Sequence, residues 1–196
     1  MSYRVFFALT SAVALSACGL NSVPTAEENA KAKWADVESA YQRRNDSIPN
    51  IVAAVKGAVA AEDKVLTDVM NARAKATSVQ VTANDLTDSA KVAQFQESQQ
   101  ALTSSVSRLI ATVEAYPSVK SQENFPILIS QIDRENARIN IAQTDYNKAV
   151  QAYNTRIRTF PDAIGAKIFY GAKPMVPFKA AAGAEANPTV DFGNSN

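Results

Sequence analysis

Residues 125–160 read FPILISQIDRENARINIAQTDYNKAVQAYNTRIRTF, and this stretch decides the fold. Large apolar side chains recur in it every seven residues, at Phe125, Ile132, Ile139, Tyr146, Tyr153 and Phe160. A seven-residue spacing places these side chains on one face of an α-helix. At about 1.5 Å per residue the helix would be roughly 50 Å long, so other helices must cover its apolar face. The stretch therefore predicts a helical bundle.

Two helices are expected before residue 78. Thr25 and Glu28 have the spacing of a capping box and predict the start of the first helix. Pro49 is expected to end that helix, because proline lacks an amide donor and restricts the residue before it. The second helix is then expected from Pro49 to Thr77, and residues 77–87 are expected to form a loop.

A third helix is expected from a cap at Asp85 or Thr87 to Pro117. Its inward positions are Val92, Phe95, Leu102, Val106, Leu109, Val113 and Tyr116. Short links make consecutive helices antiparallel neighbours. The predicted fold is all-α, an antiparallel up-down four-helix bundle with long helices and coiled-coil-like spacing.

The amino terminus has the features of a secretory signal. Residues 1–17 contain one basic residue, Arg4, followed by a short apolar run and small residues. The sequence LSAC at 15–18 resembles a bacterial lipobox, which implies that Cys18 carries fatty acyl chains such as palmitate. By the same resemblance, Gly19 favours the outer membrane if the cell is Gram-negative. The alternative is a buried apolar start of the first helix.

The remaining boundaries follow from composition. Residues 18–24 are expected to form a lipidated tether, residues 25–160 the bundle and residues 161–179 a carboxy-terminal extension. Residues 180–196 are small and polar enough for a disordered tail. Two alternatives stay open for residues 161–178, which mix basic and apolar side chains: contact with a lipid surface, or a cap on the end of the bundle.

Composition argues against several function classes. The chain has 20 Lys and Arg against 19 Asp and Glu, so no excess of positive charge indicates nucleic-acid binding. It has no His, and Cys18 is its only Cys, so the nucleophile and metal sites that use these residues are excluded. No glycine-rich phosphate loop is present. The sequence predicts a non-enzymatic protein without a cofactor or metal.

Polar residues on the expected helices form two candidate groups. Arg44, Glu62, Glu135 and Arg138 are expected at similar heights, far from the anchor, and form a candidate polar belt. They either pair with one another to fix helix register or bind an anionic or polar ligand. A carboxylate-bridged metal is a third reading, but the histidines that such bundles use are missing.

Asn147, Asn154 and Arg156 form the second group, a candidate recognition strip beside the tyrosines. They either present a polar surface to a partner or hydrogen-bond neighbouring helices and backbone.

Short motifs along the mature chain resemble the LemA family. They are WADVE (34–38), QRRNDSIPNI (42–51), VKG (55–57), ARAK (72–75), RL (108–109), VEAYP (113–117), ENARI (135–139), DYN (145–147), YNTRI (153–157), FP (160–161) and VDF (190–192). The resemblance implies an α-helical bundle at a bacterial membrane, commonly anchored by a transmembrane segment. This chain departs from the pattern because it has a lipobox instead. The family implies no agreed biochemical activity.

Two functions remain open at this point. The first is an envelope lipoprotein, anchored through acylated Cys18, that acts as an adaptor or scaffold for a membrane or secreted protein. The second is a lipid or small-molecule binding protein that uses the bundle core.

Overall fold

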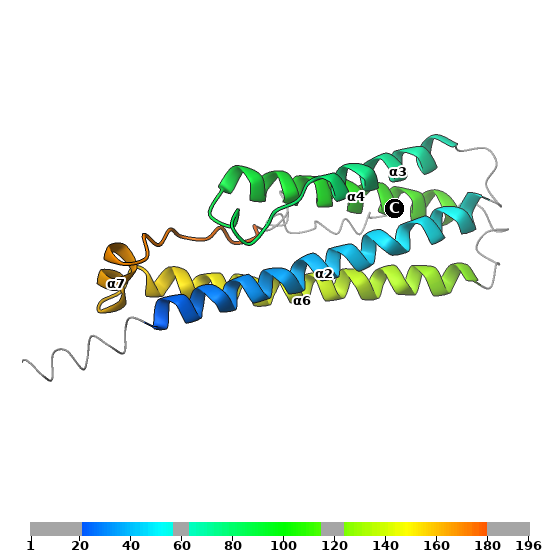
Figure 1. Cartoon of the computed structure of the whole chain (residues 1–196). Coiled ribbons are helices and arrows are strands. Elements are labelled where there is room, and N and C mark those ends of the chain that lie inside the picture. Colours follow the sequence, from blue (N-terminus) through cyan, green and yellow to red (C-terminus); the bar gives the residue numbers. More distant parts are fainter. Residues whose placement is uncertain (1–20, 57–62, 115–123, 180–196) are drawn as a thin grey trace, which may run out of the picture.

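The computed structural model describes residues 21–56, 63–114 and 124–179. These residues form five α-helices and no strand: α2 (Ser22–Lys56), α3 (Asp63–Ser78), α4 (Ser89–Glu114), α6 (Asn124–Arg156) and α7 (Asp162–Ile168). The four long helices lie side by side and alternate in direction, and the short α7 lies at the end where α2 begins (Figure 1). The predicted all-α fold of long packed helices is confirmed.

The bundle consists of two pairs of helices. The backbones of α2 and α6 approach closely, as do those of α3 and α4, and α2 also approaches α3. Close approach between α4 and α6 is slight or absent. The α3–α4 pair also leaves the first turns of α2 and the last turns of α6 uncovered (Figure 1). The separation of α4 from α6 opens a groove. The uncovered turns of α2 and α6 leave room for the carboxy-terminal chain.

The seven-residue column forms the buried face of α6 as predicted, with one exception. Phe125, Ile132, Ile139, Tyr146 and Tyr153 are buried, but Phe160 is 82% exposed. The helix ends at Arg156, and the following residues form turns. The side chain of Phe160 therefore leaves the face that a continuing helix would have given it.

The first helix differs from the prediction at both ends. It begins at Ser22, within the expected tether, and the Thr25 hydroxyl donates to the Asn21 carbonyl one turn back rather than capping the helix. It also continues through Pro49 to Lys56. A proline within a helix leaves the carbonyl four residues earlier without its donor. That carbonyl belongs to Asn45, and the Nε–H of Arg73 on α3 donates to it at 2.7 Å. The replacement donor explains why Pro49 does not end the helix.

This explanation makes a prediction for Arg73→Met. The substitution leaves the Asn45 carbonyl without a donor, so we expect the free energy of unfolding to fall by about 1 to 3 kcal/mol. In a Pro49→Ala background the helix recovers its own donor, and the loss should become clearly smaller. Denaturant unfolding of the four proteins in this double-mutant cycle measures the difference. Equal losses in both backgrounds would contradict the explanation.

The loop before α4 is fixed at several points. Asp88 caps the helix, because its Oδ1 accepts from the backbone amides of Ala90 at 2.9 Å and Lys91 at 3.2 Å. The predicted caps, Asp85 and Thr87, are therefore wrong by a few residues. Asp85 instead accepts from the Lys91 ammonium and from the Thr82 hydroxyl and amide, which together lower its pKa to about 2.

The chain after α7 returns along the uncovered part of the bundle, and we call residues 171–179 the strap. The strap buries Met175 and Phe178. The Val176 amide donates to the Leu86 carbonyl at 2.9 Å, so the strap also contacts the loop before α4. Phe178 joins an aromatic cluster with Trp34, Phe95 and Tyr146. For this part of the extension, the structure corresponds to the alternative of a cap on the bundle.

Candidate functional site

An open groove lies between α4 and α6, whose backbones come close at few points or none. Its volume is about 730 Å³, and α2 contributes Tyr41 and Arg44 to its lining. The other lining residues are mostly amides and hydroxyls, among them Gln99 and Thr103 from α4 and Asn140 and Gln143 from α6. Lys179, at the end of the strap, also lines the groove. We refer to this hollow as the α4–α6 groove.

Arg44 is the only buried cation in the described part of the chain, and its residue is 4% exposed. One terminal nitrogen donates to the Thr103 hydroxyl at 2.8 Å, and the other donates to the Gln99 side-chain oxygen at 2.8 Å. The guanidinium carbon lies 5.1 Å from the centre of the Tyr41 ring. The Tyr41 hydroxyl in turn accepts from Gln143 at 2.6 Å. Neutral groups of α4 and α2 thus hold the guanidinium in place, and α6 holds the Tyr41 hydroxyl.

The charge of Arg44 has no counter-ion in the part of the chain that the structure describes. No carboxylate of residues 21–56, 63–114 or 124–179 lies within 4.0 Å of it, although eight other ion pairs form there. Its buried Nε–H also lacks a hydrogen-bond partner. Burial lowers the pKa of the guanidinium, but arginine stays charged at neutral pH. A buried cation held only by neutral groups is costly, and an anion supplied from outside would compensate it.

The described members of the candidate polar belt, Arg44, Glu135 and Arg138, do not form one network. Glu135 is buried and binds the exposed Arg138 on its own helix at 3.0 Å, while its second oxygen has no partner. Arg138 lines a different hollow, together with Arg43 and Asp145. Arg44 faces the α4–α6 groove instead, and Glu62 lies outside the described residues. Of the three members that the structure describes, only Arg44 lines the groove.

The candidate recognition strip is occupied by the chain itself. The side-chain amide of Asn147 both accepts from the Phe178 amide and donates to the Phe178 carbonyl, at 2.8 and 3.1 Å. Asn154 makes the same pair of bonds with Met175, at 2.9 and 2.8 Å. Arg156 lies 3.7 Å from Asp162 of α7. The asparagines therefore hold the strap, which corresponds to the backbone-binding alternative.

Two tyrosines reinforce the same attachment. The hydroxyls of Tyr146 and Tyr153 donate to the carbonyls of Val176 and Lys173, at 3.0 and 3.1 Å. Burial raises the pKa of both hydroxyls. They thus remain protonated donors well above neutral pH.

Sequence reasoning missed the residues that surround Arg44. Gln99 occupies an inward position of α4 between Phe95 and Leu102, in a stripe that is otherwise apolar. A polar side chain at such a position indicates a buried partner, and this signal could have drawn attention to Gln99. Lys179 gave no such signal, because its place in the groove depends on the path of the strap.

None of the described helices is both long and apolar enough to cross a membrane. In residues 21–56, 63–114 and 124–179, Asp and Glu do not gather in groups of three or more that could hold a metal ion.

Comparison with known proteins adds one match. The model of the LemA family matches residues 33–192, which include all of the groove residues named above. The curated proteins contain no sequence that matches this chain.

Proposed function

Because this chain belongs to the LemA family, we propose that it is a membrane-anchored lipoprotein of the bacterial envelope that acts as a non-enzymatic adaptor. In this proposal Cys18 carries the lipid, and the α4–α6 groove binds an acidic segment of a membrane or secreted protein. The lipobox-like LSAC at 15–18 supports the anchor. The absence of His and of any Cys other than Cys18 in the sequence supports a role without catalysis.

The buried charge of Arg44 carries the adaptor proposal. A guanidinium binds carboxylates through paired hydrogen bonds, and its affinity for them rises when water is excluded. The amides that line the groove can hydrogen-bond a peptide backbone. Lys179 adds a second positive charge against the one acidic lining residue, Glu97. The groove between the two helices is partly open to solvent, which is compatible with an extended segment.

Site-specific cross-linking in intact cells tests this proposal. Asn140 is exposed on the rim of the groove, so a photoreactive residue placed there should yield one defined protein adduct. The same residue placed at Ser39, which is exposed in the hollow next to Arg138, should not yield that adduct. Introducing Arg44→Met should remove the adduct, because the groove then lacks its buried charge.

Three controls make the result decisive. Thermal unfolding shows whether Arg44→Met still folds, and Arg44→Gln, which also removes the charge, is the second variant if it does not. A chain ending at Lys179 is cross-linked in parallel as a control for the acidic tail. Residues 180–196 contain Glu185 and Asp191 and no basic residue, so the tail is itself an acidic segment. An adduct that persists unchanged without the Arg44 guanidinium, or no adduct at Asn140 in repeated experiments, would count against an adaptor that uses this groove.

A second candidate function is binding of a small anionic molecule. Its support is the volume of the groove, about 730 Å³, which falls within the range of small-molecule sites. Native mass spectrometry of the intact protein distinguishes the two candidates. A retained small molecule that disappears in Arg44→Met would favour this function over the adaptor.

The anchor makes its own prediction. Cys18→Ser removes the acceptor of the acyl chains, so the protein should move from the membrane fraction to the soluble fraction or remain unprocessed. Cell fractionation and mass spectrometry of the purified protein measure this change. Unchanged mass together with unchanged fractionation would contradict lipidation at Cys18.

A further inference from the structure

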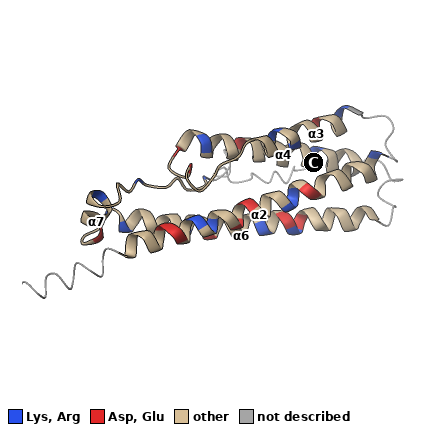
Figure 2. Cartoon of the chain, in the orientation of Figure 1, with Lys and Arg blue, Asp and Glu red and all other residues tan. Residues whose placement is uncertain are grey.

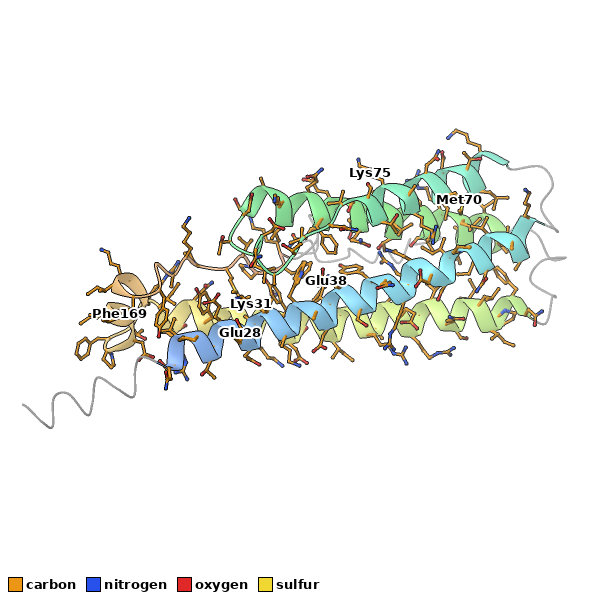
Figure 3. The ribbon with its side chains drawn as sticks, viewed as in Figure 1. Glu28, Lys31, Glu38, Met70, Lys75 and Phe169 are labelled. Atoms are coloured by element: carbon orange, nitrogen blue, oxygen red, sulfur yellow. The ribbon has the colours of Figure 1, made fainter. Side chains whose placement is uncertain are left out.

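The end of the bundle around α7 exposes an unusual amount of apolar surface. Five large apolar side chains are exposed within eleven residues: Phe160 at 82%, Ile164 at 53%, Ile168 at 69%, Phe169 at 68% and Tyr170 at 43%. The only other exposed large apolar residues in the described part are Met70, Ile127 and Ile141, which lie on three separate stretches. Figure 3 shows the Phe169 ring pointing away from the bundle. A cluster of exposed apolar side chains of this kind marks an interaction surface.

The patch is held on a fixed support. Ala166 is buried, so one side of α7 packs against the bundle, where α7 approaches α2. The Ala172 amide donates to the Ala166 carbonyl at 3.0 Å, and the strap beyond it is attached to α6. Asp162 binds Arg156. The exposed side chains are therefore displayed outward by a helix whose opposite face is already covered.

Basic residues surround the patch. Residues 156–179 contain five basic residues and one acidic residue. The acidic residue, Asp162, binds Arg156, whereas Arg158, Lys167 and Lys173 are exposed and form no ion pair with a described residue. Figure 2 shows basic residues on α7 and at the adjoining end of α6. On the neighbouring surface of α2, Glu27 and Glu28 are both bound to Lys31. The patch thus combines apolar side chains with uncompensated positive charge.

The position of the patch relative to the chain start identifies the partner. Arg156 lines one hollow with Asn21, Ser22 and Thr25, so this end of α6 lies beside the start of α2. Cys18 precedes Asn21 by three residues, which span at most about 10 Å. A lipid attached at Cys18 would bring the bilayer surface to this end of the molecule.

From these observations we infer that the α7 surface, formed by Phe160, Ile164, Lys167, Ile168 and Phe169, binds the interface of an anionic lipid bilayer. The apolar side chains enter the boundary between head groups and acyl chains, and the cations lie at the anionic head groups. This inference rests on the proposed anchoring through Cys18. It adds a second contact that fixes the orientation of the bundle on the membrane. The α4–α6 groove then lies away from the end of the bundle that contacts the lipid.

Vesicle binding without the lipid anchor tests the inference. The protein starting at residue 18 with Cys18→Ser should sediment with vesicles of phosphatidylglycerol and phosphatidylcholine, and only weakly with phosphatidylcholine alone. Ile168→Ser with Phe169→Ser should reduce the fraction bound to anionic vesicles by about tenfold or more. The matched control is Ile127→Ser with Ile141→Ser, which removes two exposed apolar side chains elsewhere on α6 and should leave binding unchanged. Both pairs of sites are exposed, so melting temperatures should stay close to that of the parent.

Several outcomes would overturn the inference. These are no binding by the parent protein, equal loss in the control pair, or an α7 pair that binds as well as the parent. A dimer in sedimentation that the α7 pair converts to a monomer would assign the surface to a second copy of the chain instead. None of these outcomes depends on lipidation or on Arg44, so failure here is distinct from failure of the anchor or of the groove.

Discussion

Replacing Trp34 by Ala should lower the free energy of unfolding by about 3 to 5 kcal/mol. Trp34 is completely buried and contacts three aromatic rings, with centroid distances of 5.4 Å to Phe95, 5.3 Å to Tyr146 and 5.7 Å to Phe178. These rings come from α4, α6 and the strap, so the cavity left by the substitution in α2 would lie where four segments meet. Denaturant unfolding measures the loss.

A matched substitution separates packing from hydrogen bonding at this site. The Trp34 Nε1–H donates to the Val81 carbonyl at 2.9 Å. Trp34→Phe keeps an aromatic ring but leaves that carbonyl without its donor, so we expect a smaller loss than for the Ala variant. If Trp34→Ala costs less than about 1 kcal/mol, the aromatic cluster does not stabilise the bundle.

Ending the chain at Tyr170 should destabilise the protein by at least about 4 kcal/mol relative to a chain ending at Lys179. The shorter chain lacks the buried side chains of Met175 and Phe178. It also leaves the amides of Asn147 and Asn154 without the backbone groups that they bind. Thermal and denaturant unfolding of the two truncated proteins measure the contribution of the strap alone, because both lack residues 180–196.

The comparison also separates the strap from the α7 surface. Both truncated chains keep Phe160, Ile164 and Phe169, so a difference in stability between them belongs to residues 171–179. Equal stability of the two chains would show that the strap adds nothing to the bundle. Equal stability would also mean that the hydrogen bonds from the Tyr146 and Tyr153 hydroxyls to the strap do not stabilise the protein.

Periodic burial is the part of this fold that the sequence predicts well. The column from Phe125 to Tyr153 and the apolar positions of α4 identify the faces that pack, because helical geometry links residue spacing to direction. Local rules failed where a distant residue intervenes. Pro49 would end a helix on its own, but Arg73 supplies the missing donor from another helix.

The candidate site shows the same division. The sequence identifies Arg44 as a member of a candidate polar belt, but it does not show which residues face it. Gln99 and Thr103 meet Arg44 because α4 packs with α3 and leaves a groove toward α6. The strap is harder to predict, because it has no periodic pattern. Its path is fixed by side chains such as Asn154, which lies about 20 residues away in sequence. Helix spacing alone gives no information on such a path.

The measurement that tests the proposed role of Arg44 most directly is the nuclear magnetic resonance signal of its Nε–H group. This signal is assigned by its loss in Arg44→Lys, and it is followed while a tetraglutamate peptide is added at constant ionic strength. If the buried guanidinium receives an acidic segment, the signal should shift saturably with tetraglutamate and not with tetralysine or added sodium chloride. A signal that responds to tetraglutamate no more than to sodium chloride would contradict the proposal that the groove binds acidic partners.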